Sequence, residues 1–275
     1  MTIPQDEQNT RLRPLRPLRA VKMAIRLGWD HIGLWMIVGF TLFSLLSVPL
    51  MVWQFGHLIP PLILVFICAL IVALGFGPLL AGAHTIAWDI GDHRETGWLD
   101  LWRGARELMI PAALLGLIHM VVLIVGTVAL WFYLRQHSFI SVIATLVCIY
   151  CLGTWVVLAP LQMPLLVMQE RGVFDEPERR ARRGAVAVIR RSFFVALGAP
   201  AATCALLIAN IGILSFSVLT VITLPLFTVG MLAMLNDQVV RALLVRFFVL
   251  PPPLDPQEAV EDEEFRVKFR ADGEK

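Results

Sequence analysis

The chain has 275 residues, of which 58% are apolar and only 16% are charged, and its mean hydropathy is +0.76. This composition excludes an ordinary soluble globular domain. The formal net charge of +2 says little by itself, but the basic residues lie beside the ends of long apolar runs instead of forming a patch for nucleic acid, so we expect no nucleic-acid partner.

Four long runs contain no Asp, Glu, Lys or Arg, and they cover 31–88, 108–134, 136–169 and 192–236. About 20 apolar residues cross a bilayer as a helix, so these runs hold two, one, one and two spans respectively. The sequence therefore predicts an all-α polytopic membrane protein with about six transmembrane helices. We place the first four spans at about 31–53, 60–84, 110–133 and 139–167.

The last run is short for two spans. They fit into 192–236 only if a tight turn joins them, which we place near Asn210–Ile211–Gly212. A re-entrant hairpin in the same run is the alternative. With two full spans, the six helices pair as three hairpins, each followed by an amphipathic cytoplasmic helix.

Basic residues are distributed unevenly about the predicted spans. When both termini and the 85–109 and 170–191 linkers are assigned to one side, Arg135 is the only Lys or Arg on the other. Positive residues in short loops favour the cytoplasmic side. The sequence thus predicts a multi-pass protein of the inner cell membrane with both termini in the cytoplasm.

The two ends of the chain differ in composition from the span region. Residues 1–18 contain a proline-punctuated arginine repeat and are expected to form a flexible basic arm. Residues 251–275 begin with three prolines and are rich in acids, which predicts a disordered tail. The six-helix domain lies between them at 19–250, and it opens with a helical lead-in near 19–28 that carries basic residues on one face.

A short amphipathic segment follows the second span, at about 97–109. Trp98 and Trp102 begin an apolar face with helical spacing, while Arg103 and Arg106 lie on the other side. Tryptophan favours the headgroup boundary, so this surface is a candidate for contact with lipid headgroups or with a partner protein. Packing of the apolar face against the ends of the spans is the alternative.

A second cytoplasmic helix is predicted at about 176–191, where acids precede a run of arginines in the order that a helix dipole favours. Its candidate contacts for a lipid phosphate or a partner are Arg179, Arg180, Arg182 and Arg183. The alternative is a basic loop whose role is to set the membrane topology.

The even-numbered spans share a Pro-Leu pair deep in the membrane, at Pro78, Pro160 and Pro225. The first acid after each pair marks the end of that span, and these acids are Asp89, Glu170 and Asp237. Proline kinks a helix and frees a backbone carbonyl group. Three kinks at matching depth either enclose a cavity open to the cytoplasm or serve the packing of the helices.

Three stretches carry a resemblance to known proteins: Gly77–Ala81, Trp98–Gly104 and the arginine-rich linker around Arg180 that leads to the fifth span. In these stretches the chain resembles the YesL-like family of bacterial integral membrane proteins of unknown function, over about 20–248. The resemblance implies a multi-pass membrane protein, in some cases associated with sugar uptake and polysaccharide use. It implies no established active site.

Few polar side chains lie within the spans. The candidates for chemistry or transport are His119, Gln162 and Asn210, together with His84 near the end of the second span. His119 could take up a proton, although a lone histidine in a span also suits an interhelical hydrogen bond.

Outside the spans, the densest cluster of titratable residues is Asp89, Asp92, His93 and Asp100. Hydrolytic chemistry requires a base, a nucleophile and an orienting partner together, and this cluster is more simply interpreted as a solvated turn. We therefore predict no catalytic residue, no metal site and no cofactor.

The preferred hypothesis is a non-catalytic membrane protein that acts as an accessory or partner-binding component of a membrane complex, with a link to solute or sugar uptake. Its partners are then the lipid bilayer and a second membrane protein. The alternative is a transporter of small molecules or lipids that uses a cavity between the proline-kinked helices. The sequence leaves the oligomeric state open.

Overall fold

The structure is a computed structural model and describes residues 17–56, 60–136, 138–174, 184–220, 227–247 and 249–250. Within these ranges the regular structure is entirely helical, and six helices are long and apolar enough to cross a membrane. The prediction of an all-α polytopic membrane protein with about six spans is therefore confirmed. Most of the predicted arm, the acidic tail, Pro225 and the arginines Arg179, Arg180, Arg182 and Arg183 lie outside the described residues.

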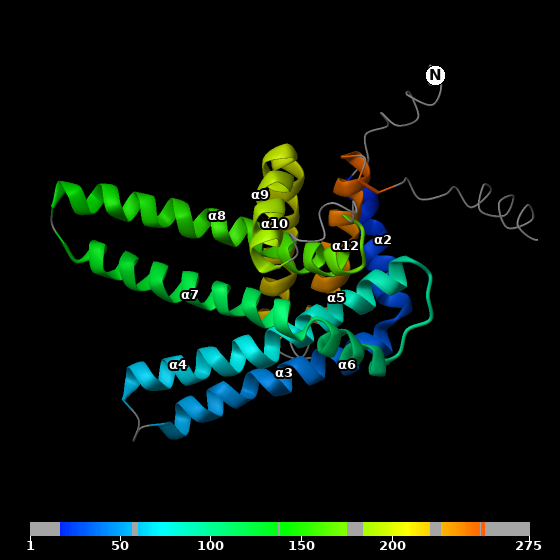
Figure 1. The fold of residues 1–275 in the computed structure, drawn as a ribbon, viewed down its shortest axis with the longest axis horizontal. Helices are drawn as coiled ribbons and strands as arrows, with labels where there is room; N and C mark the ends of the chain where they lie inside the picture. Colours follow the sequence, from blue (N-terminus) through cyan, green and yellow to red (C-terminus); the bar gives the residue numbers. More distant parts are fainter. Residues whose placement is uncertain are drawn as a thin grey trace, which may run out of the picture.

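Two long helical hairpins extend side by side toward the left of Figure 1. In each, a helix runs outward and its successor returns antiparallel beside it, as the short connections between successive spans predict. The first hairpin pairs α3 (Ile32–Phe55) with α4 (Pro61–Ile71), and the second pairs α7 (Met109–Leu134) with α8 (Phe139–Glu170).

The second span continues beyond α4 and changes its helical type. A π-helix, η2, occupies Val72–Phe76, and α5 follows at Gly77–Gly91. Pro78 lies just after η2, so the change of helical type coincides with the proline, whose missing N–H interrupts the backbone hydrogen bonds of a continuous helix. The helix extends past the predicted end near 84 because its last two turns are packed inside the protein, where Ile86, Ala87 and Ile90 are buried.

The prediction of a tight turn near Asn210 is wrong. Helix α10 (Pro200–Thr220) runs through that position without a break, and the next candidate span, α12 (Thr228–Arg246), begins only after Thr220, so the two spans are joined further along the chain than predicted. A separate bend at Ala199 divides α9 (Ala185–Gly198) from α10. Proline is favoured at a helix start, which explains the boundary before Pro200. Asn210 is accommodated within the helix because its side-chain amide donates hydrogen bonds to the Leu206 carbonyl and to Asn236.

The second linker helix also differs from its predicted extent. The helix of this region, α9, continues past the predicted end at 191 to Gly198 and is stopped by the bend before Pro200. It buries Ala185, Val188, Ser192 and Val195, which recur at helical spacing and define the face packed on α8.

The N-terminal helix α2 (Pro17–Asp30) packs along the last helix, α12 (Thr228–Arg246). Its contact face contains Ala24 and Gly28, and a Cβ atom at Gly28 would lie 2.9 Å from the Met231 sulfur. Small residues thus let the two helices approach closely. The last two residues of the predicted basic arm belong to this helix, and proline is tolerated in its first turn.

The helices form three similar units in which a short helix precedes a pair of longer ones. The short helix of each unit packs on the second long helix of another: α6 (Trp98–Glu107) on α5, α9 on α8, and α2 on α12. The three contacts form a cycle, in which each unit covers the preceding one. Helix α2 of the first unit closes this cycle because it covers α12 of the third unit.

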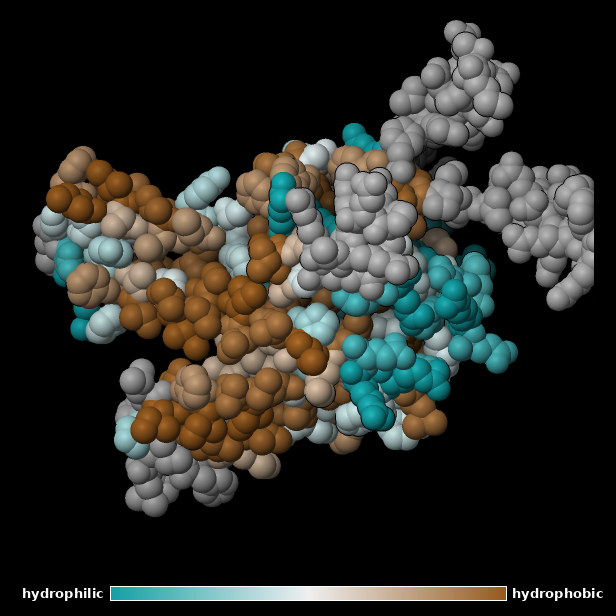
Figure 2. Space-filling model, viewed as in Figure 1, coloured by the Kyte–Doolittle hydropathy of each residue, from teal (hydrophilic) through white to brown (hydrophobic). Residues whose placement is uncertain are grey.

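The core lies where the second long helices of the three units converge. The segments that follow Pro78 and Pro160 are almost wholly buried, as is the middle of α12. The outer halves of the two long hairpins instead expose large apolar side chains, which form the brown surfaces of Figure 2, while hydrophilic residues gather at the opposite end. Apolar exposure on this scale fits contact with lipid.

Candidate functional site

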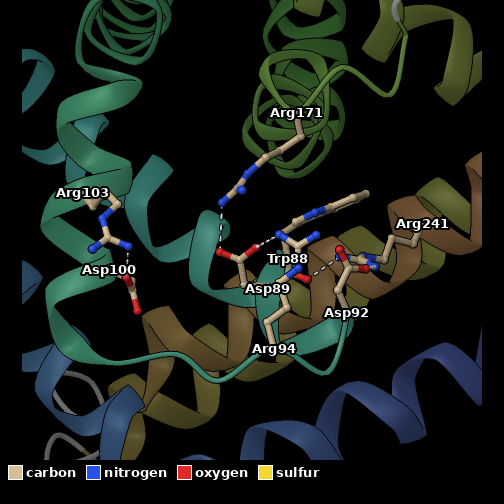
Figure 3. Close-up of polar contacts among 8 residues, drawn as sticks. All are labelled: Trp88, Asp89, Asp92, Arg94, Asp100, Arg103, Arg171 and Arg241. Carbon is tan, nitrogen blue, oxygen red and sulfur yellow. Dashed lines mark hydrogen bonds and ion pairs between the residues drawn. The ribbon is translucent and has the colours of Figure 1, made fainter. Parts of the chain in front are cut away.

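Charged residues from three helices meet at the end where the core helices converge. Asp89 and Asp92 lie at the end of α5, Arg171 lies at the end of α8, and Arg241 lies on α12 (Figure 3). Each of these residues lies at, or within four residues of, the first acid that ends its span, and the convergence of the helices brings them within reach of one another.

Asp89 joins α5 to α8. Its Oδ2 atom lies 2.9 Å from Nη2 of Arg171, and its Oδ1 atom lies 3.6 Å from Nη1 of Arg94. Only 13% of the Asp89 side chain is exposed, so these arginines replace much of the water that a carboxylate needs. The pair therefore fixes the end of the second hairpin against the end of the first.

Arg241 joins α12 to α5 through Asp92 and Trp88, and it also pairs with Asp237 of its own helix. Its Nη1 atom lies 2.6 Å from Asp92 Oδ1 and its Nε atom lies 2.9 Å from Asp237 Oδ2. The guanidinium group also stacks over the Trp88 ring at 3.6 Å and donates a hydrogen bond to the Trp88 carbonyl oxygen. Asp237 is completely buried, so Arg241 is the cation that compensates its charge.

A third polar contact fastens α9 to α8. Arg191 donates a 2.6 Å hydrogen bond from Nη1 to Gln169 Oε1, and its guanidinium group lies 4.3 Å from the centre of the Phe174 ring. Together with Asp89 and Arg241, this contact gives each neighbouring pair of units a polar connection at the same end of the molecule.

Helix α6 is held on α5 by a close approach of glycines. A Cβ atom at Gly104 would lie 2.9 Å from Thr85 Cβ, and one at Gly82 would overlap the Leu101 carbonyl oxygen. Leu101 and Ala105 complete the buried face of α6. The predicted packing of this helix against the span ends is therefore correct for one of its faces.

The outward face of α6 presents the tryptophans that the sequence singled out. Trp98 is 48% exposed and Trp102 is 46% exposed. Arg103 and Arg106 are exposed beside them, and Arg103 pairs with Asp100 of the same helix at 3.0 Å. Asp100 is thus separate from the cluster around Asp89 (Figure 3).

A small pocket of about 150 Å³ lies between α5, α6 and α8. It is lined by Thr85, Glu107, Leu108, Val167, Glu170 and Arg171. This volume is below the roughly 300–1,000 Å³ of typical small-molecule sites, and it suffices for a few water molecules.

The polar candidates inside the spans occupy separate places. His119 on α7 shares a 2.9 Å hydrogen bond with the Leu115 carbonyl of its own helix and contacts the Trp155 ring of α8 edge-on. Asn210 donates a 2.8 Å hydrogen bond to Asn236 across α10 and α12. Gln162 is completely buried, and neither of its amide atoms has a hydrogen-bond partner among the residues that the structure describes.

The charged residues at the ends of the spans make more contacts between helices than the sequence predicts. Asp92 is more than part of a solvated turn, because it pairs with Arg241 from a distant part of the chain. The spacing of Asp237 and Arg241 by one helical turn could have predicted the ion pair between those two residues, but it does not indicate the pair with Asp92. No comparable signal links Asp89 to Arg171. Among the described residues, no group of three or more His, Cys, Asp or Glu side chains is placed to hold a metal ion.

No protein-family model matches the chain, and neither does any curated protein or solved structure. The resemblance to the YesL-like family therefore stays a prediction.

Proposed function

We propose that the protein is a non-catalytic accessory component of an inner-membrane complex and binds its partner through the outward face of α6. In this proposal the convergent end of the helices faces the cytoplasm, and the link to solute or sugar uptake follows from the YesL-like resemblance. The partner is a second membrane protein.

The observation that carries the proposal is that α6 has one face packed on α5 and an opposite face exposed. Its inner face is fixed on α5 by Gly82, Gly104 and the buried Leu101, so the helix is pre-organised. Its outer face carries Trp98 and Trp102, each about half exposed at 48% and 46%. Tryptophan and arginine are enriched at the energetic centres of protein interfaces, and a rigid helix loses little entropy on binding.

The charged cluster at the convergent end supports the proposal in a different way. Asp89, Asp92, Arg171 and Arg241 are engaged in ion pairs with one another or with neighbours. These ion pairs connect α5, α8 and α12, so α5, on which α6 packs, is held in a fixed position. The exposed arginines of α6 lie outside this network, and among the described residues Arg103 pairs only locally, with Asp100 of its own helix.

Site-specific photo-crosslinking in native membranes tests the proposal. A photoreactive phenylalanine analogue replaces Leu99, which is 62% exposed on α6, and a matched variant carries it at Val186, which is 75% exposed on α9. We expect one discrete protein adduct from position 99 and none of that mass from position 186. Adducts with lipid alone at position 99 would contradict partner binding.

A second candidate function is transport of a small molecule, and Gln162 favours it. This fully buried amide lies shortly after Pro160 and has two unpartnered polar atoms, which is costly in an apolar interior unless water or a solute bonds to them. In proteoliposomes, Gln162→Leu would then abolish solute flux while leaving the fold stable. Flux that is absent from the unaltered protein for every solute tried, or insensitive to this change, would favour the accessory role.

A further inference from the structure

Helix α2 has two distinct faces. The face packed on α12 contains the small residues Ala24 and Gly28, both buried. On the opposite side, Lys22, Arg26 and Trp29 are exposed, and their spacing of four and three residues places them in one row along the helix. The row of charge and tryptophan therefore points away from the protein.

The exposed face of α2 combines positive charge with apolar surface. Trp29 is 72% exposed and Ile25, beside the row, is 52% exposed. Within the described part of the chain, no ion pair involves Lys22 or Arg26. Asp30 is the one acid of α2, and it lies at the end of the helix. The face thus places two exposed cations beside exposed apolar side chains.

Helix α2 lies directly before a candidate membrane span. The backbone N–H of His31 donates to the Leu27 carbonyl and that of Trp35 donates to the His31 carbonyl, so α2 joins the candidate span α3 across one residue. In Figure 1, α2 turns away from the line of α3 and runs across its end. Tryptophan, lysine and arginine at such a boundary are typical anchors for headgroups.

We propose that the outward face of α2, formed by Lys22, Arg26 and Trp29, binds the headgroups of anionic phospholipids. The lysine and arginine attract the negative phosphodiesters, and Trp29 with Ile25 enters the layer between headgroups and acyl chains. Because the other face of α2 packs on α12, lipid binding holds in place the helix that closes the cycle of three units. Each lysine or arginine near an anionic lipid surface strengthens the attraction to that surface by roughly fivefold, so we expect a measurable preference for anionic over zwitterionic lipid.

Quenching by brominated lipids measures this contact directly. The full-length protein is reconstituted in phosphatidylcholine vesicles with one quarter phosphatidylglycerol, and the bromine is carried either by the anionic or by the zwitterionic lipid at equal total bromine. Subtraction of the Trp29→Phe signal isolates Trp29 from the other tryptophans. We expect Trp29 to be quenched at least twofold more when bromine is on the anionic lipid.

The double variant Lys22→Glu/Arg26→Glu should lose this preference, and Lys22→Gln/Arg26→Gln should reduce it. Both positions are exposed, so the variants are expected to fold, which the unchanged quenching of the remaining tryptophans verifies. The matched variant Arg103→Glu/Arg106→Glu, on α6, should keep the preference. Equal quenching by the two lipids in the unaltered protein, or a Trp29 that neither lipid reaches because protein covers it, would overturn the proposal.

Discussion

The two halves of α8 have the same apolar character and opposite surroundings. In the first half Phe139 is 80% exposed and Tyr150 is 75% exposed, whereas Leu165 and Leu166 in the second half are fully buried. The high hydropathy of the sequence indicates that both halves are removed from water, but it does not distinguish contact with lipid from contact with protein. Contact between helices is what makes the second half a core.

Polar side chains mark the difference between the two halves. Gln162 and Gln169 lie in the packed half, and Arg191 reaches Gln169 from α9. The same holds for the other helices that converge there, where Asp89 and Asp237 end in ion pairs. Specific packing and polar connections therefore coincide, and substitutions should have large effects at the convergent end and small effects on the outer hairpins.

The largest loss of stability is expected from Arg241→Ala. This change leaves the fully buried Asp237 without its cation, which typically costs about 3–5 kcal/mol. The free energy of unfolding, measured by denaturant titration in mixed micelles, should fall by that amount. Arg246→Ala, at an exposed position near the end of the same helix, should cost under about 1 kcal/mol, and equal losses for the two variants would show that the ion pair is unimportant.

A pair of leucines on α8 tests the comparison of its two halves. Leu166→Ala opens a cavity at a fully buried site and should cost about 2–5 kcal/mol. Leu146 is 62% exposed on the outer half, so Leu146→Ala should change the free energy of unfolding by about 0.5 kcal/mol or less. Similar losses at both positions would mean that the outer half is packed against another protein surface.

Two glycines should respond to alanine with opposite signs. At Gly104 the new Cβ atom would lie 2.9 Å from Thr85 Cβ, and the forced separation of α6 from α5 should cost about 1–3 kcal/mol. At Gly153 no atom lies within 4 Å of the new Cβ, so the higher helix propensity of alanine should stabilise the protein by about 0.5–1 kcal/mol. Thermal unfolding in detergent distinguishes the two, and a stabilising Gly104→Ala would refute the close approach.

The smallest predicted effect concerns the hydrogen bond between Asn210 and Asn236. Interhelical hydrogen bonds in membranes contribute only about 0.6 kcal/mol on average. A double-mutant cycle with Asn210→Leu and Asn236→Leu should therefore give a coupling energy near that value. A coupling energy of zero would mean that the two amides do not bond across α10 and α12.

The spans could be predicted from the sequence because charged residues are excluded from the bilayer, so each predicted span lies in a continuous run without charged residues. The prediction failed at Asn210, where the usual preference of asparagine for turns is overridden by hydrogen bonds within α10 and to α12. Pro200 is the local signal for the boundary between α9 and α10, because proline is favoured at a helix start. Ion pairs such as that of Asp89 with Arg171 join residues far apart in the chain, and only the packing of the helices reveals them.

The candidate site was predictable in part. The amphipathic pattern of α6 identified Trp98, Trp102, Arg103 and Arg106 as its polar and aromatic surface. It could not decide which apolar residues face protein, and the structure assigns that role to Leu101 and Ala105 while the tryptophans stay exposed. The reason is that the glycines at 82 and 104 set the rotation of α6 on its neighbour.

Native mass spectrometry of the protein extracted gently from its own membrane tests the central claim most directly. Partner binding through α6 predicts a stoichiometric second protein that is lost from Arg103→Glu/Arg106→Glu and retained by Lys22→Glu/Arg26→Glu. A chain that appears alone, or a second protein that stays bound to the α6 variant at full occupancy, would contradict the account.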